Sequence, residues 1–361
     1  MMDMYDQALA VAPGWRYARM GLGLAISLLC LWLALRDIAL DAVLLSLRQA
    51  QPAWVALALL TVLLTNLAKA ARWRLLFYPH HRHLPIRSLF AILLGGQAVS
   101  LAIPIRGGEL VRAYLVGARF GDSKAQTLAT VGVEKVLDLA MLALCVLILT
   151  PFLVTTTPLG AAVLTSRRLA LMVGAFIMLA GATIGLLWRQ QWMALARRLL
   201  DRLPNGRGAR WIGLLDAVLR GLDALRYPSV VIRLILWSLG AWLLAGATNF
   251  LTLLALHMQG DWVISFTLLA VLQAGISVPS SPGKIGVFQY LCQLTLAWFG
   301  ATAAHGFAVG VLLYAIAPLA LMVSGGLLLL WQTWQRRQDA PAAAAGALPV
   351  GERREPGEAR P

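Results

Sequence analysis

The chain has 361 residues, of which 60% are hydrophobic and 13% are charged, and its mean hydropathy is +0.74. Soluble globular domains average about 45–50% apolar and 25% charged residues, so this composition excludes an ordinary soluble enzyme. The 31 Lys and Arg residues against 16 Asp and Glu residues give a net charge of +15. In a membrane protein such an excess reflects cytoplasmic loops that face anionic lipid, so we predict membrane lipids as partners and no nucleic acid.

Six apolar segments are long enough to cross a bilayer core of roughly 30 Å, which takes about 20 helical residues. These predicted spans cover residues 17–35, 53–71, 125–154, 169–188, 230–256 and 306–331. The first 16 residues carry two aspartates, and no A-x-A site follows the first apolar segment. Residues 17–35 are therefore predicted to be a membrane span and not a cleaved signal peptide.

Four further apolar segments form two adjacent pairs, 88–103 with 110–120 and 263–278 with 285–299. Proline, glycine and charged residues interrupt each pair, so continuous helix is unlikely there. Each pair is predicted to be either a re-entrant hairpin that enters half of the membrane or two short full spans. The predicted fold is all-α and polytopic, with about six full spans plus these two broken or re-entrant helix pairs.

Basic residues are concentrated in the segments 72–87 and 189–226, whereas the connections near residues 259 and 303 carry none. Because Lys and Arg accumulate on the cytoplasmic side, both termini are predicted to be cytoplasmic, in the cytoplasmic (inner) cell membrane. Residues 189–228 combine apolar residues at helical spacing with charges opposite, which indicates an interfacial amphipathic segment that either anchors passively or senses anionic lipid. Residues 339–361 lack periodicity and are predicted to be a disordered tail after a single membrane domain at 1–338.

The two interrupted pairs match each other in sequence. Gln97-Ala98 and Pro104 correspond to Gln273-Ala274 and Pro279, and from the prolines onward the offset is a constant 175 residues. One long span precedes each pair and another follows it, so repeat 1 covers about 53–154 and repeat 2 about 230–332. The charge distribution makes the pairs enter from opposite sides, which predicts an inverted repeat with a transporter-like site where the interrupted helices meet.

Each break is predicted to open a polar cavity, because backbone freed from a helix at membrane depth must bond to protein or water. Ser281 and Pro282 suit the N-cap and first position of a helix starting there, whose free N–H groups attract phosphate or carboxylate near Gly283. Lys284 at this break, and two arginines at the first, add positive charge to the same region.

Several charged residues lie in apolar segments, where each costs at least a few kcal/mol unless it faces a cavity or a partner. Glu109 is spaced to pair with either neighbouring arginine, Arg106 or Arg112. Glu134 and Asp138 share a helix face, and Lys135 lies between them in sequence. Two interpretations stay open: an internal ion pair that holds helices together, or a path for a substrate or protons.

Other polar residues have simpler interpretations. Asn66, Lys69 and Arg72, near the cytoplasmic end of the second span, are predicted to extend to the membrane interface. Tryptophans near span ends are predicted to form interfacial belts. They are Trp54, Trp73, Trp188, Trp237 and Trp331.

The remaining reactive residues do not indicate catalysis. Cys30, Cys145 and Cys292 lie in apolar segments without C-x-x-C spacing and are predicted to be buried apolar side chains. His80, His81 and His83 have no nearby carboxylate in sequence, so we predict a hydrated turn and no metal site. The chain lacks G-x-x-x-x-G-K-[ST], G-x-S-x-G and H-E-x-x-H motifs, and we expect no cofactor and no enzymatic activity.

Three motifs resemble those of the flippase-like transmembrane region of lysylphosphatidylglycerol synthases. Residues 104–112, PIRGGELVR, are similar to the family's P-x-R-x-G-E-x-x-R; residues 134–138, EKVLD, to its E-R-x-x-D; and residues 279–286, PSSPGKIG, to its P-x-x-P-G-G-x-G-x-x-E. The likeness covers about 53–331. The chain departs from the family at Lys135, Lys284 and Gln289, where Arg, Gly and Glu are usual, and the last change weakens any carboxylate-dependent role for the second pair.

The resemblance implies that this region moves lipid between leaflets, while aminoacyl transfer belongs to a separate soluble domain that we do not expect here. We therefore expect an integral membrane protein that binds or translocates a phospholipid or lipid-linked molecule with an anionic or zwitterionic head group. The expected path residues are Arg106, Gly108, Glu109, Arg112, Glu134, Lys135, Asp138, Ser281, Pro282, Gly283 and Lys284. The alternative is an accessory protein that presents lipid to a separate lipid- or glycan-modifying enzyme; a membrane-embedded transferase is the weakest third possibility.

Overall fold

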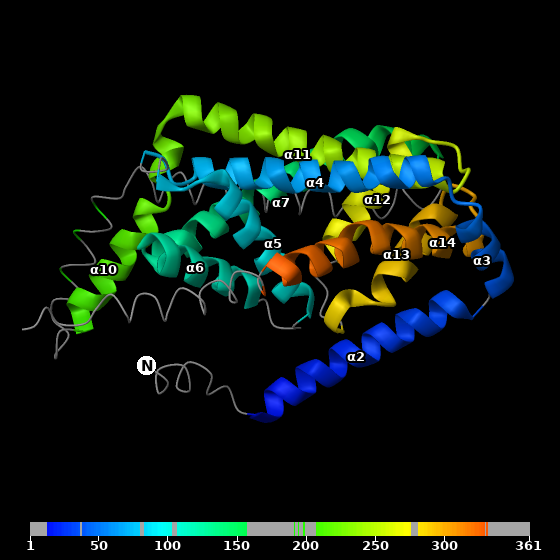
Figure 1. The fold of residues 1–361 in the computed structure, drawn as a ribbon, viewed down its shortest axis with the longest axis horizontal. Coiled ribbons are helices and arrows are strands. Elements are labelled where there is room, and N and C mark those ends of the chain that lie inside the picture. The colour runs from blue at the N-terminus through cyan, green and yellow to red at the C-terminus, as the bar shows by residue number, and fades with distance from the viewer. Residues whose placement is uncertain are drawn as a thin grey trace, which may run out of the picture.

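The structure is a computed structural model, and every regular element in the part of the chain that it describes is helical, as predicted (Figure 1). The described residues are 13–36, 38–79, 83–102, 107–156, 191, 194, 198, 207–275, 281–328 and 330.

Six helices make up the N-terminal half of the described fold. They are α2 (Pro13–Leu35), α3 (Leu40–Arg48), α4 (Pro52–Leu75), α5 (Ile86–Ala102), α6 (Gly107–Phe120) and α7 (Lys124–Thr156). The C-terminal half combines five α-helices with three short helical turns. They are α10 (Arg207–Arg220), η2 (Asp223–Arg226), α11 (Pro228–Ala255), α12 (Trp262–Gly275), η3 (Pro282–Lys284), α13 (Val287–Ala297), α14 (Ala303–Tyr314) and η4 (Ala315–Leu319).

Four helices among the described residues are long and apolar enough to cross a membrane: α4, α7, α11, and α14 together with its continuation to Leu328. They match four of the six predicted spans. The predicted span at 17–35 coincides with the 23-residue helix α2, and the one at 169–188 lies outside the described residues. Both α4 and α11 begin with proline, which suits the first helical turn because that N–H has no partner within a helix.

The two interrupted pairs are helical hairpins of short helices. α5 has 17 residues, α6 and α12 have 14 each, and α13 has 11. At 1.5 Å per residue even α5 extends only about 25 Å, less than the roughly 30 Å core of a bilayer. The helices end and begin on either side of the predicted interruptions, with α5 ending at Ala102 and α6 beginning at Gly107, and α12 ending at Gly275 and α13 beginning at Val287. Residues 103–106 and 276–280 lie outside the described residues.

α4 and α11 pack side by side in opposite directions and form the most extensive helix pair of the bundle (Figure 1). The backbone N–H of Gln51 donates to the carbonyl of Ala255 at 2.9 Å, and the hydroxyls of Thr61 and Thr248 lie 2.9 Å apart. Hairpin α5–α6 lies toward the end of this pair where α4 finishes, and hairpin α12–α13 lies toward the other end (Figure 1). The turn η3 of the second hairpin contacts α5, so the two hairpins meet between the ends of the long helices.

The predicted helix start at Ser281–Pro282 is wrong. Only the three-residue turn η3 forms there, because Gly283 adopts φ +76°, which interrupts a helix. The helix α13 begins at Val287 instead, after Gly286 at φ +88°. The amide oxygen of Gln289 accepts a hydrogen bond from the N–H of Gly286 at 2.8 Å, so this residue, where the family has Glu, caps the helix start.

The predicted amphipathic segment forms a helix over α10, and most of 189–206 lies outside the described residues. Trp211 and Leu214 are exposed on α10, which suits contact with a membrane interface. A Cβ at Gly221, just after α10, would lie 2.8 Å from the carbonyl of Gln126, so this turn packs tightly against α7. α10 lies at the end of the bundle where α11 begins (Figure 1).

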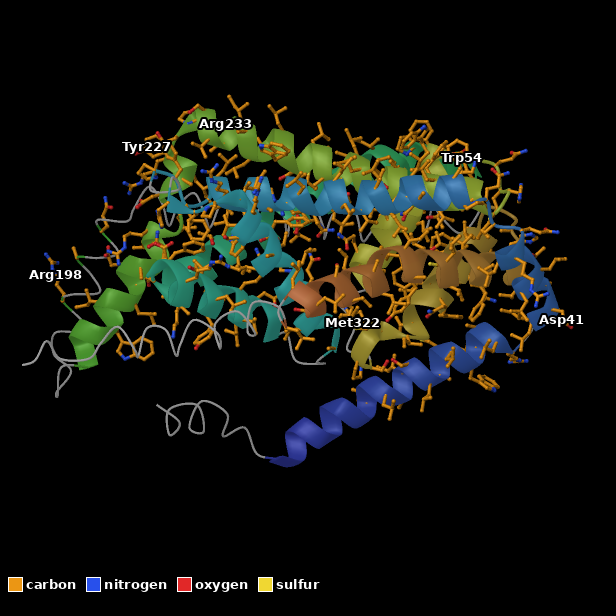
Figure 2. The ribbon with its side chains drawn as sticks, viewed as in Figure 1. Asp41, Trp54, Arg198, Tyr227, Arg233 and Met322 are labelled. Atoms are coloured by element: carbon orange, nitrogen blue, oxygen red, sulfur yellow. The ribbon has the colours of Figure 1, made fainter. Side chains whose placement is uncertain are left out.

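The two ends of the helical bundle carry different side chains (Figure 2). Tyr227 and Arg233 lie at the end where α11 begins, whereas Trp54 and Asp41 lie at the opposite end. The aromatic residues at both ends suit membrane interfaces. The basic Arg233 at one end and the acidic Asp41 at the other agree with the charge asymmetry seen in the sequence.

Candidate functional site

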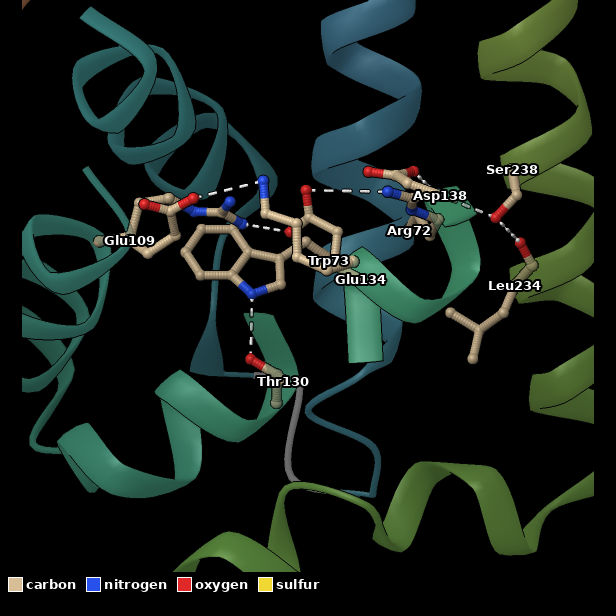
Figure 3. A network of polar contacts seen from close by, with 10 residues as sticks. Arg72, Trp73, Glu109, Thr130, Glu134, Asp138, Leu234 and Ser238 are labelled. Atoms are coloured by element: carbon tan, nitrogen blue, oxygen red, sulfur yellow. Dashed lines mark hydrogen bonds and ion pairs between the residues drawn. The ribbon is translucent and has the colours of Figure 1, made fainter. Parts of the chain in front are cut away.

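Four charged side chains converge from the three helices α4, α6 and α7, of which α4 and α7 pack on α11 (Figure 3). Arg72 comes from α4, Arg112 from α6, and Glu134 and Asp138 from α7. We call these four residues the charged network. Figure 3 also shows a hydroxyl from α11, that of Ser238, beside Arg72.

Arg72 is the centre of the charged network. Its Nη1 donates to Asp138 Oδ1 at 2.8 Å and to Ser238 Oγ at 3.1 Å, and its Nη2 lies 3.7 Å from Glu134 Oε1. Arg112 Nη2 donates to the other Glu134 oxygen at 2.5 Å. Arg72, Arg112 and Glu134 are buried, whereas the Asp138 side chain remains 25% exposed. Glu134 therefore joins two arginines, and Asp138 is the part of the network that other molecules can reach.

The prediction that Arg72 extends to the membrane interface is wrong, because its side chain is fully buried in these contacts. Asn66 on the same helix is also buried, while Lys69 is partly exposed. Arg72 is the member of this candidate site that the sequence did not indicate. Its partners come from two other helices, so no local spacing in the sequence indicates them.

Trp73 contacts the charged network through Arg112. The guanidinium carbon of Arg112 lies 4.0 Å from the centre of the Trp73 ring, a cation–π contact, and Trp73 Nε1 donates to Thr130 Oγ1 at 3.1 Å (Figure 3). Trp73 is fully buried, so its assignment to an interfacial belt is wrong. The physical reason is that the last turns of α4 are covered by packed helices and a buried indole N–H requires an acceptor.

Two glycines allow the close packing of the first hairpin, and one of them, Gly96, makes room for Arg112. A Cβ at Gly96 would lie 2.5 Å from Arg112 Cγ, and a Cβ at Gly108 would lie 2.0 Å from the carbonyl oxygen of Gly96. α5 and α6 therefore approach each other as closely as backbones allow at this crossing. Gly108, one of the predicted site residues, acts through this close packing.

Glu109 pairs with Lys135 and not with Arg112, and Arg106, the other arginine that the sequence predicted, lies outside the described residues. Its Oε1 lies 3.3 Å from Lys135 Nζ, in a contact between α6 and α7 (Figure 3). Glu134 takes Arg112 instead, because it lies across the helix interface within direct hydrogen-bond reach. Lys135 is 57% exposed, so this second ion pair lies on an accessible edge of the cluster.

The second hairpin holds the other predicted site residues, apart from Arg106, which lies outside the described residues. The N–H of Ser281 donates to Ser27 Oγ on α2 at 2.8 Å, and the Tyr314 hydroxyl donates to the carbonyl of Gly283 at 2.7 Å. Pro282 and Lys284 belong to the same turn, η3, which contacts α5. The structure thus brings the two hairpins together but anchors the second one to α2 and α14.

The histidine-rich loop differs from its prediction. His83 Nε2 lies 3.1 Å from Asp122 Oδ2, so a carboxylate from the connection between α6 and α7 does approach this loop. His80 and His81 lie outside the described residues. Within the described part of the chain, no group of three or more His, Cys, Asp or Glu side chains is placed to hold a metal ion. Cys145 and Cys292 are buried and Cys30 is partly buried; all three are free thiols.

The arrangement of hairpins and buried charges can be compared with known proteins. The family described as Lysylphosphatidylglycerol synthase TM region matches residues 20–341 of the chain. The chain belongs to this family. No curated protein and no solved structure matches it. Membership of this family and the four long apolar helices make the chain a membrane protein related to lipid handling.

Proposed function

We propose that this protein binds a phospholipid or lipid-linked molecule and translocates its head group between the two leaflets, without catalysing a reaction. One observation carries the proposal: two interrupted helix pairs from opposite ends of the α4–α11 pair meet, with buried charges beside them. Charged side chains at membrane depth are costly and by default mark a substrate path or an internal ion pair. The described network contains both fully paired and partly exposed charges, so it includes internal ion pairs and also part of a substrate path.

Packing of the helices supports an inverted repeat. In the first repeat α4 packs on α5, α5 on α6 and α6 on α7; in the second α11 packs on α12, α12 on α13 and α13 on α14. The two repeats also contact each other in equivalent ways, since the last helix of each packs on the first helix of the other. α7 packs on α11, and the continuation of α14 at η4 packs on α4. Transporters built in this way place their sites where the interrupted helices meet.

The short helices favour re-entrant hairpins, because none of the four reaches across the hydrocarbon core. We place the first hairpin on the cytoplasmic side and the second on the outer side of the inner membrane, with both termini cytoplasmic. The basic segments near α10 and the start of α11 support this orientation.

Within the network we assign two kinds of role. Arg72, Arg112 and Glu134 are buried and mutually paired, and they hold α4, α6 and α7 in register. Asp138 and the Glu109–Lys135 pair are partly exposed and contact the head group. Arg106 and Lys284 at the two breaks add positive charge to this path, and the membrane lipid itself is the partner.

Leaflet exchange of head-group-labelled phosphatidylglycerol in proteoliposomes tests the proposal. The variant Asp138→Asn keeps an acceptor oxygen for Arg72 but removes the charge, and we expect it to slow exchange about tenfold or more. Asp216→Asn is the matched control, because Asp216 on α10 is also paired with an arginine and is 26% exposed, against 25% for Asp138. We expect this control to exchange lipid as the wild type does.

Protease protection establishes that each protein is inserted correctly. Exchange that is equal in Asp138→Asn and Asp216→Asn contradicts the placement of the path. If the inserted wild type exchanges no lipid above protein-free vesicles, translocation is wrong and the accessory function, presenting lipid to a separate enzyme, replaces it.

A further inference from the structure

Lys69 on α4 is a cation without a direct partner beside the charged network. It makes no hydrogen bond or ion pair with any residue that the structure describes, yet it interacts electrostatically with Asp138, Arg72, Glu134 and Lys135. It is partly exposed, in a helix apolar enough to cross a membrane. An unpaired ammonium group at this depth is costly and requires a compensating anion or water.

The geometry of α4 directs Lys69 away from the nearer end of the helix. Side chains of an α-helix lean toward its N-terminus, and α4 ends at Leu75, next to the loop that we place in the cytoplasm. Lys69 therefore leans away from the nearer membrane surface. Extension of this lysine to the cytoplasmic interface would run against the direction of its own Cα–Cβ bond.

The charge balance of the described cluster is positive. Lys69, Arg72, Arg112 and Lys135 face only Glu109, Glu134 and Asp138, which leaves one positive charge uncompensated. Three nitrogens in these arginines, Arg72 Nε, Arg72 Nη2 and Arg112 Nε, are also buried without a hydrogen-bond acceptor among the described residues. Buried N–H groups are nearly always bonded, so these donors and the surplus charge point to an absent anionic acceptor.

We propose that Lys69 binds the phosphodiester of an anionic phospholipid, next to the ion pair of Arg72 with Asp138. The lipid enters at the open side of the network, where Asp138 and Lys135 are accessible. This inference rests on the proposed function, since it names the phosphate contact of the same site. Lys69 is a better phosphate ligand than Arg112, because the Arg112 guanidinium already contacts Glu134 and Trp73.

Thermal unfolding of the purified full-length protein in a zwitterionic detergent tests this assignment. The probes are dioleoylphosphatidylglycerol, dioleoylglycerol, which has the same chains without phosphate, and inorganic phosphate. A ligand that binds the folded state raises the melting temperature, and at a given concentration a tighter ligand raises it more. We expect the phosphatidylglycerol to stabilise the wild type and dioleoylglycerol not to do so.

Three variants locate the effect. The variant Lys69→Gln loses a charged hydrogen bond, so its apparent affinity for the phosphatidylglycerol should fall about tenfold to a hundredfold. The variant Lys69→Arg should retain the wild-type affinity. Lys124→Gln is the control, because Lys124 is exposed and stacks on Tyr114 at 4.9 Å, away from the network. If Lys69→Gln does not fold, amine-reactive labelling of the wild type replaces it: the phosphatidylglycerol must protect Lys69 and not Lys124.

The outcomes separate this inference from lipid translocation. Equal affinity of Lys69→Gln and wild type, or equal stabilisation by dioleoylglycerol, overturns the Lys69 site whatever the exchange assay shows. Lys69-dependent binding without leaflet exchange supports the site and overturns translocation. Stabilisation of the wild type by inorganic phosphate alone, with loss in Lys69→Gln, supports an anion site but overturns a lipid as its ligand.

Discussion

Arg72 illustrates how a buried charge is tolerated in this protein. Its guanidinium is shared by two carboxylates and a serine hydroxyl from two neighbouring helices. Desolvating charges costs several kcal/mol per ion, and direct hydrogen bonds recover this cost only when the partners are held in place. The cation–π contact of Arg112 with Trp73 and the bond from Trp73 to Thr130 provide that rigidity at the other end of the network.

Replacing Arg72 by methionine should destabilise the protein by about 3–5 kcal/mol, because it leaves the Asp138 and Glu134 carboxylates short of a buried partner. The measurement is the free energy of unfolding in detergent micelles. Arg233→Met is the control: Arg233 is exposed and its Nε donates to the carbonyl of Ser229 on its own helix, so we expect a change below about 0.5 kcal/mol.

A second substitution checks the cause. Adding Asp138→Asn to Arg72→Met removes one of the orphaned charges and should recover part of the lost stability, since contacting residues are not additive. If the double variant is as unstable as the sum of the single variants, the pair makes no direct contribution and the charged network is not a unit.

The first hairpin depends on close contact between α5 and α6. Gly108 and its neighbour Gly107 are adjacent in sequence but differ in surroundings, because a Cβ at Gly108 would overlap the carbonyl of Gly96 whereas one at Gly107 has its nearest atom at 3.9 Å. The two positions therefore form a natural pair for testing the packing.

We expect Gly108→Ala to force α5 and α6 apart, to cost about 1–3 kcal/mol and to slow leaflet exchange. Gly107→Ala should be neutral or slightly stabilising, since alanine favours the helix at a position with free space. Unfolding of both variants in the same detergent measures the difference. Similar behaviour of the two variants would show that the hairpin is looser than this close approach indicates.

The helix that follows the second hairpin contains an irregular turn that the spacing of apolar residues in the sequence does not predict. Residues 315–319 widen into a π-turn around Pro318, which lacks an N–H and cannot continue the regular ladder. Tyr314, just before this turn, donates to the carbonyl of Gly283. The irregular turn thus begins directly after the residue that contacts the second break.

The molecule as a whole presents two chemically different ends. Asp41 lies at one end, and Tyr227, next to Arg226, lies at the other (Figure 2). In a background with the native cysteines replaced by alanine, Asp41→Cys should react with a membrane-impermeant maleimide in intact cells. Arg226→Cys, at a side chain that is 45% exposed, should react only after permeabilisation. Reversed labelling of the two positions would invert the proposed topology.

Much of the architecture follows from local sequence. The positions of α4, α7, α11 and α14, the two interruptions and the amphipathic helix α10 are predictable because hydropathy, proline and glycine act on a few neighbouring residues. The family motifs likewise identified Glu134, Asp138 and Arg112 as members of one site. For these features the residues that decide the structure lie next to one another in the chain.

The pairing of the charges was decided only by tertiary structure. Asp138 and Ser238 lie 66 and 166 residues from Arg72, so their contacts depend on how α4, α7 and α11 pack. The same packing buries Trp73 and pairs Glu109 with Lys135. It leaves Lys69 unpaired among the described residues. Sequence alone determined which segments are apolar enough to cross a membrane. Three-dimensional proximity, which hydropathy does not encode, determined which charged residues neutralise one another.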